Sequence, residues 1–348
     1  MPKKRQAHIL VRGAYDVPGD KVIADAPATI LPYPKNLRRD RWGLAQWLFD
    51  PKNPLTARVI VNRYWQSYFG QGLQQNADNF GNQGGLPSHL ELLDWLAIKF
   101  RETGWNVKEL QKLIVLSATY RQQSKGTVES LAKDPSNILL SRGPSFRLSA
   151  EMLRDAALKA SGLLFDTIGG PSVKHYQPAG LWAVNSEVYV QDTGKNLFRR
   201  SMYTFWKRTN PPPSMSTFDA PIRSSCIVQR QKTNTPLQAL VLLNDPQFIE
   251  ASRVLYQQAY SKTKELEEQV KYCYRSLAGL SPSAKEIEVL KKQYQQHLKK
   301  FSKDPSKMTG WLEAGTLRKI EAKDRVSVAA GTVMVNTIMN SDAFIMRR

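Results

Sequence analysis

The sequence predicts a mainly α protein, in which two helical lobes are joined by an irregular, proline-rich centre with a short β-hairpin. Three observations lead to this prediction. Apolar residues recur at helical spacing on both sides of the centre, helix-capping residues precede several of these stretches, and the helical period disappears over 165–234. With 348 residues, 41% of them hydrophobic, the chain can bury a sizeable core in two or three lobes.

The first 35 residues are expected to be an extended segment. HILVRGAYDVPGDKV is typical of a short strand followed by a turn at Pro18-Gly19. The next stretch, ADAPATILPYPKN, is interrupted by prolines, so we expect it to run over the surface of another part of the protein. The composition of 1–35 therefore predicts an extended segment and no helical lobe.

The first helical lobe is predicted over 36–164. Asn53-Pro54 fits a helix start, and Ser88 with Glu91 forms the pattern of a capping box. Asn106 and Ser149 mark two further starts. The residues expected to face the core lie at helical spacing: Val61, Tyr64, Trp65, Tyr68 and Phe69; Leu92, Leu93, Leu96 and Phe100; Leu110, Leu113 and Ile114; Met152, Leu153, Ala156 and Ala160.

The irregular centre covers 165–234, and the second helical lobe covers 235–348. In the centre, turn residues flank Val188–Val190, which indicates a short strand or hairpin. Thr235, Pro236 and Gln238 combine a cap, a first-turn proline and a capping-box glutamine. Further starts are expected at Asp245-Pro246 and Ser281-Pro282, and the last helix, at about 324–340, is apolar on most sides and should be buried.

The net charge of +20 is the strongest bulk signal, because it predicts attraction to polyanions. No apolar run is long enough for a membrane span. The two cysteines, Cys226 and Cys273, do not suggest a disulfide framework. From Lys195 to Lys232 one acid accompanies eight basic residues, namely Lys195, Arg199, Arg200, Lys207, Arg208, Arg223, Arg230 and Lys232.

No motif for metal, haem or nucleophilic chemistry stands out. The four histidines, His8, His89, His175 and His297, are isolated in the sequence, and neither HExxH nor CxxC spacing occurs. CxxCH is absent as well, so we expect no cofactor in this chain. Glycine-rich phosphate loops and GxSxG are also missing.

Two polar clusters have both a structural and a functional interpretation. Arg147, Glu151, Arg154 and Asp155 share one helical face, which favours an exposed ion-pair ladder over a cleft lining with Glu151 or Asp155 as proton carrier. Asn62 and Arg63 lie between apolar positions of an aromatic-rich helix, and Asn79 follows in NADNFG. For these residues, hydrogen bonding that shapes a loop is favoured over ligand binding.

The segment FWKRTNPPPSMSTFDAP, residues 205–221, lies in the most basic region of the chain. In the structural interpretation Trp206 enters a core and the prolines form a stiff spacer between lobes. In the functional interpretation aromatic faces stack on sugars or bases while cations hold anionic groups. The candidate binding residues of this second interpretation are Tyr203, Trp206, Lys207, Arg208, Arg223 and Arg230.

Several long motifs occur in one order along the chain: NPLTARVIVNRYWQSYFGQGL, DNFGNQGGLPSHLELLDWLAIKF, RLSAEMLRDAAL, GGPSVKHYQPAGLW, RRSMYTFWKRTNPPPSMSTFDAPIRSSC and KTNTPLQALVLLNDPQFIEASR. The chain thereby resembles the planctomycete surface-domain family known as domain of unknown function 1553. The resemblance implies the C-terminal part of an exported, extracytoplasmic protein with a companion N-terminal domain and often a cytochrome-c-like domain. The segment 1–35 would then be a junction to a missing upstream domain, and a haem would lie on that domain. No activity is established for that family.

Three hypotheses follow. The favoured one is an accessory module that docks its companion domain and binds an acidic polysaccharide. The alternative is a polysaccharide-active or redox-coupled enzyme that uses carboxylates, arginines and aromatics, with Glu151, Asp155, Asp219 and His89 as candidate catalytic residues. Nucleic-acid binding is the least favoured, because no recognised nucleic-acid-binding motif accompanies the charge.

Overall fold

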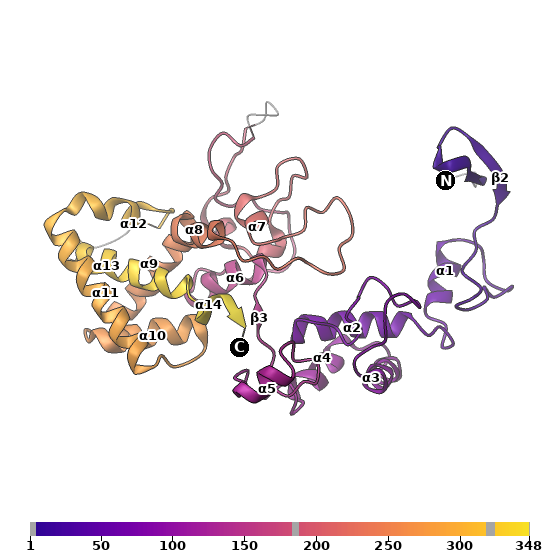
Figure 1. Ribbon diagram of the computed structural model, residues 1–348. Coiled ribbons are helices and arrows are strands. Elements are labelled where there is room, and N and C mark those ends of the chain that lie inside the picture. The colour runs from indigo at the N-terminus through magenta and orange to yellow at the C-terminus, as the bar shows by residue number, and fades with distance from the viewer. Residues whose placement is uncertain (1–4, 183–187, 318–323, 348) are drawn as a thin grey trace. The chain divides into compact units, whose positions relative to one another are not determined.

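The computed structural model describes residues 5–182, 188–317 and 324–347, and Figure 1 shows their arrangement in helices and short strands. The prediction of a mainly α protein is confirmed. The chain forms two compact units, Met1–Pro144 and Ser145–Arg348. The predicted boundary at 164/165 lies inside the second unit, because the helix that begins after Ser149 packs into that unit's core.

The first unit begins with an antiparallel hairpin of β1 (Ala7–Leu10) and β2 (Pro18–Val22). Leu10 is paired with Pro18, and the short 3-10 helix η1 (Val11–Gly13) lies in the connection. The predicted turn at Pro18-Gly19 is therefore wrong, since these residues open the second strand. Proline is tolerated there because its missing N–H falls at a strand end.

The other regular elements of the first unit are helices, joined by loops. They are α1 (Arg41–Leu48), α2 (Thr56–Phe69), α3 (Leu90–Glu102), α4 (Val107–Leu116) and α5 (Val128–Lys133). The core joins α2, α3 and α4 and contains most of the predicted apolar stripe. Within it, the rings of Trp65 and Phe69 stack with centroids 4.1 Å apart. Leu113, also predicted to face the core, is exposed.

The predicted caps of this unit have different outcomes. Asn106 accepts a hydrogen bond from the Glu109 N–H at 3.2 Å, as expected for an N-cap. Asn53 begins the turn before α2, since its side chain accepts from the N–H groups of Leu55 and Thr56. The capping box at Ser88 is wrong, because its hydroxyl donates to the Leu73 carbonyl and His89 is the residue before α3.

The second unit begins and ends in one small sheet, in which β3 (Phe146–Arg147) pairs with β4 (Met346–Arg347). Between these strands lie η3 (Gly194–Phe198), η4 (Ser201–Tyr203), η5 (Pro305–Met308) and the α-helices. The α-helices are α6 (Ala150–Ala160), α7 (Pro213–Thr217), α8 (Pro236–Asn244), α9 (Pro246–Lys262), α10 (Leu266–Ala278), α11 (Ala284–Lys303), α12 (Thr309–Glu313), α13 (Arg325–Met339) and α14 (Asp342–Ile345).

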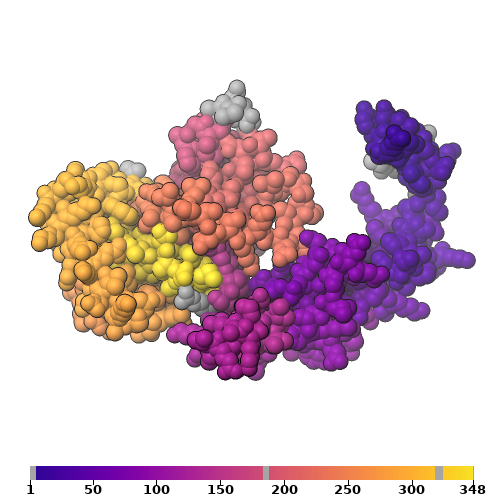
Figure 2. All heavy atoms as spheres, in the orientation of Figure 1, coloured from indigo at the N-terminus to yellow at the C-terminus, as the bar shows by residue number. Residues whose placement is uncertain are grey.

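The core of this unit is built around α9 and α13, and the predicted burial of the last long helix is confirmed. A Cβ on Gly331 would lie 2.2 Å from the Tyr256 ring, so a glycine is needed where the two helices meet. In Figure 2 the yellow atoms of the last helices lie packed against the orange atoms of the preceding ones. The cleft described below is lined by residues of the irregular segment and of the junction between α8 and α9.

The caps at Ser149, Thr235 and Asp245 are confirmed, including the capping box of Thr235 with Gln238. The predicted start at Ser281-Pro282 is displaced by two residues, because Ser283 caps α11 in a capping box with Glu286. Met152 was expected to face the core, but its side chain is exposed.

The irregular centre folds within the second unit. Val188–Val190 has no strand assignment, and the neighbouring residues 183–187 lie outside the described part of the chain. The triple proline is not a spacer between lobes. Pro213 opens α7, and the Met215 and Phe218 side chains that follow are buried in the main core of the unit.

Candidate binding cleft

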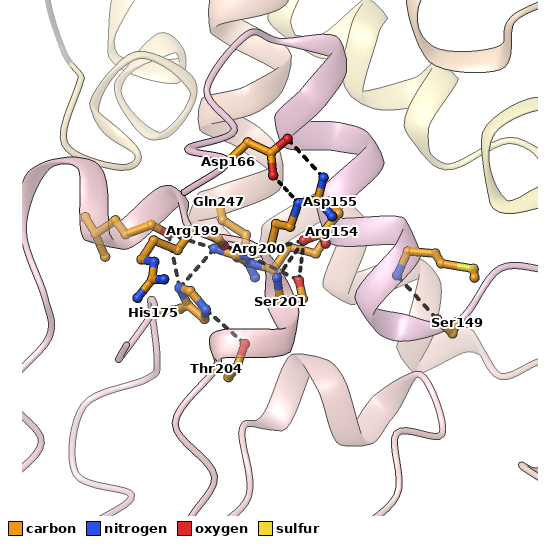
Figure 3. A network of polar contacts seen from close by, with 12 residues as sticks. Ser149, Arg154, Asp155, Asp166, His175, Arg199, Arg200, Ser201, Thr204 and Gln247 are labelled. Carbon is orange, nitrogen blue, oxygen red and sulfur yellow. Dashed lines mark hydrogen bonds and ion pairs between the residues drawn. The ribbon is translucent and has the colours of Figure 1, made fainter. Parts of the chain in front are cut away.

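A buried arginine organises the irregular segment. Arg154, on α6, donates to the carbonyl oxygens of Leu197 at 2.7 Å and Arg199 at 2.8 Å. It also donates to Gln247 Oε1 at 2.7 Å and to Ser201 Oγ at 3.2 Å (Figure 3). A guanidinium offers five N–H donors in a fixed plane, so one side chain can order several loop carbonyls at once. Burial lowers the pKa of Arg154 to about 10, and it stays protonated at neutral pH.

His175 is the neutral partner of this arginine. Its Nδ1 lies 2.9 Å from Arg154 Nη2, and its Nε2 lies 2.9 Å from Thr204 Oγ1. The same Nδ1 lies 3.0 Å from the Leu197 carbonyl oxygen. A guanidinium only donates and a carbonyl only accepts, so these two contacts of Nδ1 require opposite tautomers of the ring. Burial, together with the charge of Arg154, holds the pKa of His175 well below its usual value.

The predicted ion-pair ladder on α6 is wrong. Arg154 is buried instead of exposed, and Asp155 accepts hydrogen bonds from the Ser201 N–H at 2.8 Å and the Ser201 hydroxyl at 2.6 Å. Arg147 donates to Thr233 O and to Gln238 Oε1. Arg147 lies in β3, before the helix, and Arg154 and Asp155 are neighbours whose charged atoms are 3.7 Å apart. These side chains mainly hold segments that are distant in sequence.

A cleft of about 570 Å³ lies where the irregular segment meets the junction of α8 and α9. Such a volume is typical of a site for a small ligand. Its apolar wall comes from prolines and from α8, and its polar groups are amides, hydroxyls and one carboxyl; none of the described lining residues is lysine or arginine. The described lining residues are Tyr176, Gln177, Pro178, Gln191, Pro213, Ser214, Leu237, Leu240, Val241, Asn244, Asp245 and Pro246.

Asp245 is the only carboxyl among these described lining residues. Its side chain keeps some contact with the cleft and is surrounded by protein on its other sides. Oδ1 accepts from the Gln247 N–H at 3.0 Å, and Oδ2 from Gln247 Nε2 at 3.3 Å. Burial raises the pKa of Asp245 to about 6, and the hydrogen bonds from Gln247 and the charge of Arg154 oppose this only in part.

A small void adjoins the cleft, because Tyr176, Gln177 and Ser214 line both. Arg154, His175 and Gln247 also line the void. The Nε2 of Gln177 is buried and has no hydrogen-bond partner among the described residues. An unsatisfied buried donor costs about 1–3 kcal/mol, so Gln177 adds an unmet hydrogen-bond donor to the residues around the cleft.

The predicted residues of the second unit do not converge on this cleft. Glu151 pairs with Arg230 at 2.6 Å, and although burial alone would raise the pKa of Glu151, this contact lowers it. Asp219 accepts from the Thr233 N–H and hydroxyl.

The aromatic residues of the predicted platform are engaged within the protein. The Tyr203 hydroxyl accepts from the Gly169 N–H. Trp206 donates to Ile222 O, and the Arg223 guanidinium lies 4.8 Å from its ring centroid. Lys207 lies 4.5 Å from the Trp182 ring centroid, and Arg208 is exposed.

The predicted residues of the first unit have mainly local contacts. Asn62 is buried, with Nδ2 donating to Gln74 O at 3.0 Å and Oδ1 accepting from the Gln74 N–H at 2.9 Å. Arg63 is exposed, and Asn79 Oδ1 accepts from the Gly81 N–H. His89 contacts the Ser88 hydroxyl. The interpretation of Asn62 as a loop-shaping residue agrees with these bonds.

None of the residues that line the cleft was among the site residues predicted from the sequence. Asp245 was identified only as a helix start, and His175 only as an isolated histidine. The signal available was the position of Tyr176, Pro213 and Asp245 inside three of the quoted motifs. Motif membership does not show that the three segments meet, and their convergence is visible only in the fold.

Fold and cleft together define a mainly α protein with a ligand-sized site in its second unit. The family model PSD1, described as a protein of unknown function (DUF1553), matches residues 40–294. The chain therefore belongs to this family, as its motifs predicted. Comparison with curated proteins and with solved structures finds no match.

Among the described residues, no helix has the length and apolar character that crossing a membrane requires. Within the residues that the structure describes, no group of three or more His, Cys, Asp or Glu side chains is arranged to hold a metal ion. Both cysteines are free thiols, and Cys226 is exposed whereas Cys273 is buried.

Proposed function

We propose that the second unit is a binding module for a neutral, hydroxyl-rich saccharide, which binds in the cleft between the irregular segment and the α8–α9 junction. The single observation that carries the proposal is the composition of the cleft. Its lining combines amides, hydroxyls and a carboxyl with the apolar side chains of Leu237, Leu240 and Val241. Saccharides have both polar edges and apolar C–H faces, which such a lining matches.

The charge of the lining favours a neutral over an acidic ligand. The acidic polysaccharide was expected from the net charge of +20 and from the basic region over 195–232. Several of those cations have internal roles. Arg199 donates to Pro171 O, Arg200 pairs with Asp166, and Lys195 lies 5.4 Å from the Phe165 ring centroid. The cleft itself presents Asp245 and, among its described lining residues, no cation to attract an anion.

A binding role is also favoured over glycoside hydrolysis. Most glycoside hydrolases use two carboxyl groups about 5–10 Å apart across the scissile bond. Asp245 is the only carboxyl among the described lining residues, and the predicted candidates Glu151, Asp155 and Asp219 bond to protein groups outside the lining. Docking to a companion domain, export and an upstream haem stay predictions.

The experiment is a binding panel with the whole chain. Neutral hexasaccharides of glucose, mannose, galactose or xylose are compared with heparin, alginate and polygalacturonate by titration calorimetry at low and high salt. Binding of at least one neutral hexasaccharide with little salt dependence supports the proposal. Binding only of the acidic polymers, weakening as salt screens the charges, contradicts it. A panel with no binding also contradicts it.

Two leucines supply a matched pair of variants. Leu240 is 53% exposed and lines the cleft, whereas Leu280 is 51% exposed and lies outside it. Leu240→Trp adds bulk to the cleft and is expected to weaken neutral-saccharide binding at least about tenfold, while Leu280→Trp should leave it unchanged. Equal affinities of the two variants would show that binding occurs elsewhere.

A further inference from the structure

The side-chain amide of Gln177 has an unused hydrogen-bond donor that bears on which ligands the cleft could select. Gln177 lines both the cleft and the adjoining void, and its Nε2 is buried with no partner among the described residues. The neighbouring Tyr176 hydroxyl donates to Glu250 Oε2 at 2.8 Å, so its hydrogen is already used. Because the amide nitrogen of Gln177 is a donor, a ligand atom that satisfies it must be an acceptor, such as a hydroxyl or ring oxygen.

Asp245 is held in a fixed orientation by groups behind it. Arg154 Nε donates to Gln247 Oε1 at 2.7 Å, which turns the amide nitrogen of Gln247 toward Asp245 Oδ2. The Gln247 N–H binds Oδ1, and the Ser214 hydroxyl makes a further contact. An ionised carboxylate has about four acceptor positions, so these three contacts leave capacity for a ligand hydroxyl.

The charged surroundings of Asp245 are simple. Arg154 faces it from α6, and the neutral His175 lies next to that arginine. The segments of α7 and α8, PSMST and PLQALVLLN, contain no ionisable side chain. On α9 itself, Glu250 is bound by the Tyr176 hydroxyl and by the N–H groups of Thr316 and Leu317. Apart from Arg154, the groups that face the carboxyl are therefore uncharged or already engaged.

We propose that Gln177 and Asp245 form a donor–acceptor pair that selects the ligand: Gln177 Nε2 donates to a ligand oxygen, and the ionised Asp245 carboxylate accepts from a ligand hydroxyl. This inference rests on the proposed function and names its specificity. The pair selects uncharged polyols and sugars whose free hydroxyl groups are grouped on one edge. It disfavours ligand carboxylates and sulfates, because Asp245 would repel them.

A pH dependence follows from the acceptor role. When Asp245 is protonated, its carboxyl becomes a donor and loses acceptor capacity. Since burial raises its pKa to about 6, ligand affinity should be full above that pH and fall in acid. The nearby His175 stays neutral throughout, because burial and Arg154 hold its pKa well below the usual value.

The test uses the neutral hexasaccharide of the panel that binds most tightly, titrated at about pH 7.5 and about pH 5, on either side of the Asp245 pKa. Wild-type affinity should fall at least about fivefold at the lower pH. Asp245→Asn should weaken binding at least about tenfold at the higher pH and remove the pH dependence. Gln177→Leu should weaken it about tenfold and keep the pH dependence.

The outcomes separate this inference from the proposed function. If Leu240→Trp weakens binding while Asp245→Asn and Gln177→Leu bind as the wild type does, the donor–acceptor pair is overturned and the binding cleft stands. If Leu240→Trp also binds as the wild type does, both are overturned. Should either polar variant fail to fold by circular dichroism, the wild-type pH profile decides, because a flat profile contradicts the role of Asp245.

Discussion

Each unit contains a buried polar side chain that orders a loop: in the first unit the neutral amide of Asn62, and in the second the guanidinium of Arg154. Asn62 forms two hydrogen bonds with the backbone of Gln74, twelve residues along the chain. Arg154 binds groups that lie between 21 and 93 residues away. A compact amide completes a local loop, and a long planar cation can gather several distant segments.

The difference between these two side chains indicates which kind of segment can form a binding site. The loop held by Asn62 is fixed close to its own helix, and its polar groups bond to each other. The segments held by Arg154 are irregular, so they can place side chains such as Tyr176 and Gln177 at the rim of a cleft. The cost is a buried charge, which must be paired or hydrogen-bonded to be tolerated.

The largest effect is expected for Arg154→Met. The variant leaves the carbonyls of Leu197 and Arg199 and the amide of Gln247 without their donor, and it should lower the free energy of unfolding by about 3–5 kcal/mol. Arg63→Met is the matched control, because Arg63 is exposed and its loss should change the free energy by less than about 0.5 kcal/mol. Denaturant unfolding measures both, and equal values would refute the role of Arg154.

The next effect is a pH dependence that belongs to the second unit. Burial raises the Asp245 pKa from 3.8 to about 6, so between these values the native state holds a proton that the unfolded state has lost. Stability from this group is therefore present at low pH and is lost as pH rises to about 6, by up to about 3 kcal/mol. The difference between wild type and Asp245→Asn, measured by denaturant unfolding, should show this slope.

His175 contributes with the opposite sign. Its lowered pKa means that the unfolded state accepts a proton that the native state refuses, so stability falls as pH drops below about 6.5. Subtracting the Asp245→Asn curve from the wild-type curve cancels this contribution. A difference curve that is flat between about pH 4 and pH 6 would contradict the buried position of Asp245.

A smaller effect is expected for Asn62→Ala in the first unit. The substitution leaves the buried N–H and carbonyl of Gln74 unpaired and should cost about 2 kcal/mol, with no pH dependence because no charge is involved. Unfolding at several pH values measures both the size and the flatness. If the difference in unfolding free energy between wild type and Asn62→Ala changed clearly with pH, the contrast between the two units would be wrong.

The smallest effect distinguishes two capping sequences. Glu286 forms a capping box with Ser283 and also accepts from the Tyr274 hydroxyl at 2.6 Å, so Glu286→Ala should cost about 1 kcal/mol. Glu91→Ala should cost less than about 0.5 kcal/mol, because Ser88 does not cap α3. If thermal unfolding gives equal costs, the capping box at Ser88 must be reconsidered.

Local signals explain which parts of the fold the sequence could predict. Thr235 with Gln238, Asn106 and Ser149 were identified because a cap and its partner lie within one helical turn. The stripe of α2 was identified because burial follows the helical period. The capping box predicted at Ser88 is wrong because the Ser88 hydroxyl donates to the carbonyl of Leu73, which lies in the preceding loop and not in the helix.

The candidate site depended on contacts that no local pattern contains. Arg154 has the spacing of an exposed ion pair, and only its partners at His175, Leu197 and Gln247 reveal a buried role. The cleft combines residues 176–178, Gln191, residues 213–214 and several residues between 237 and 246. Each stretch was noticed for its composition, but their meeting depends on how α6 orders the irregular segment. Periodicity and composition do not encode that arrangement.

The most direct measurement is a crystal structure of the chain with the tightest-binding neutral hexasaccharide. Our account predicts a sugar ring in the cleft, with one oxygen accepting from Gln177 Nε2 and one hydroxyl donating to the Asp245 carboxylate. A saccharide bound instead on the basic surface around Arg208 and Arg223, with the cleft filled only by solvent, would contradict it.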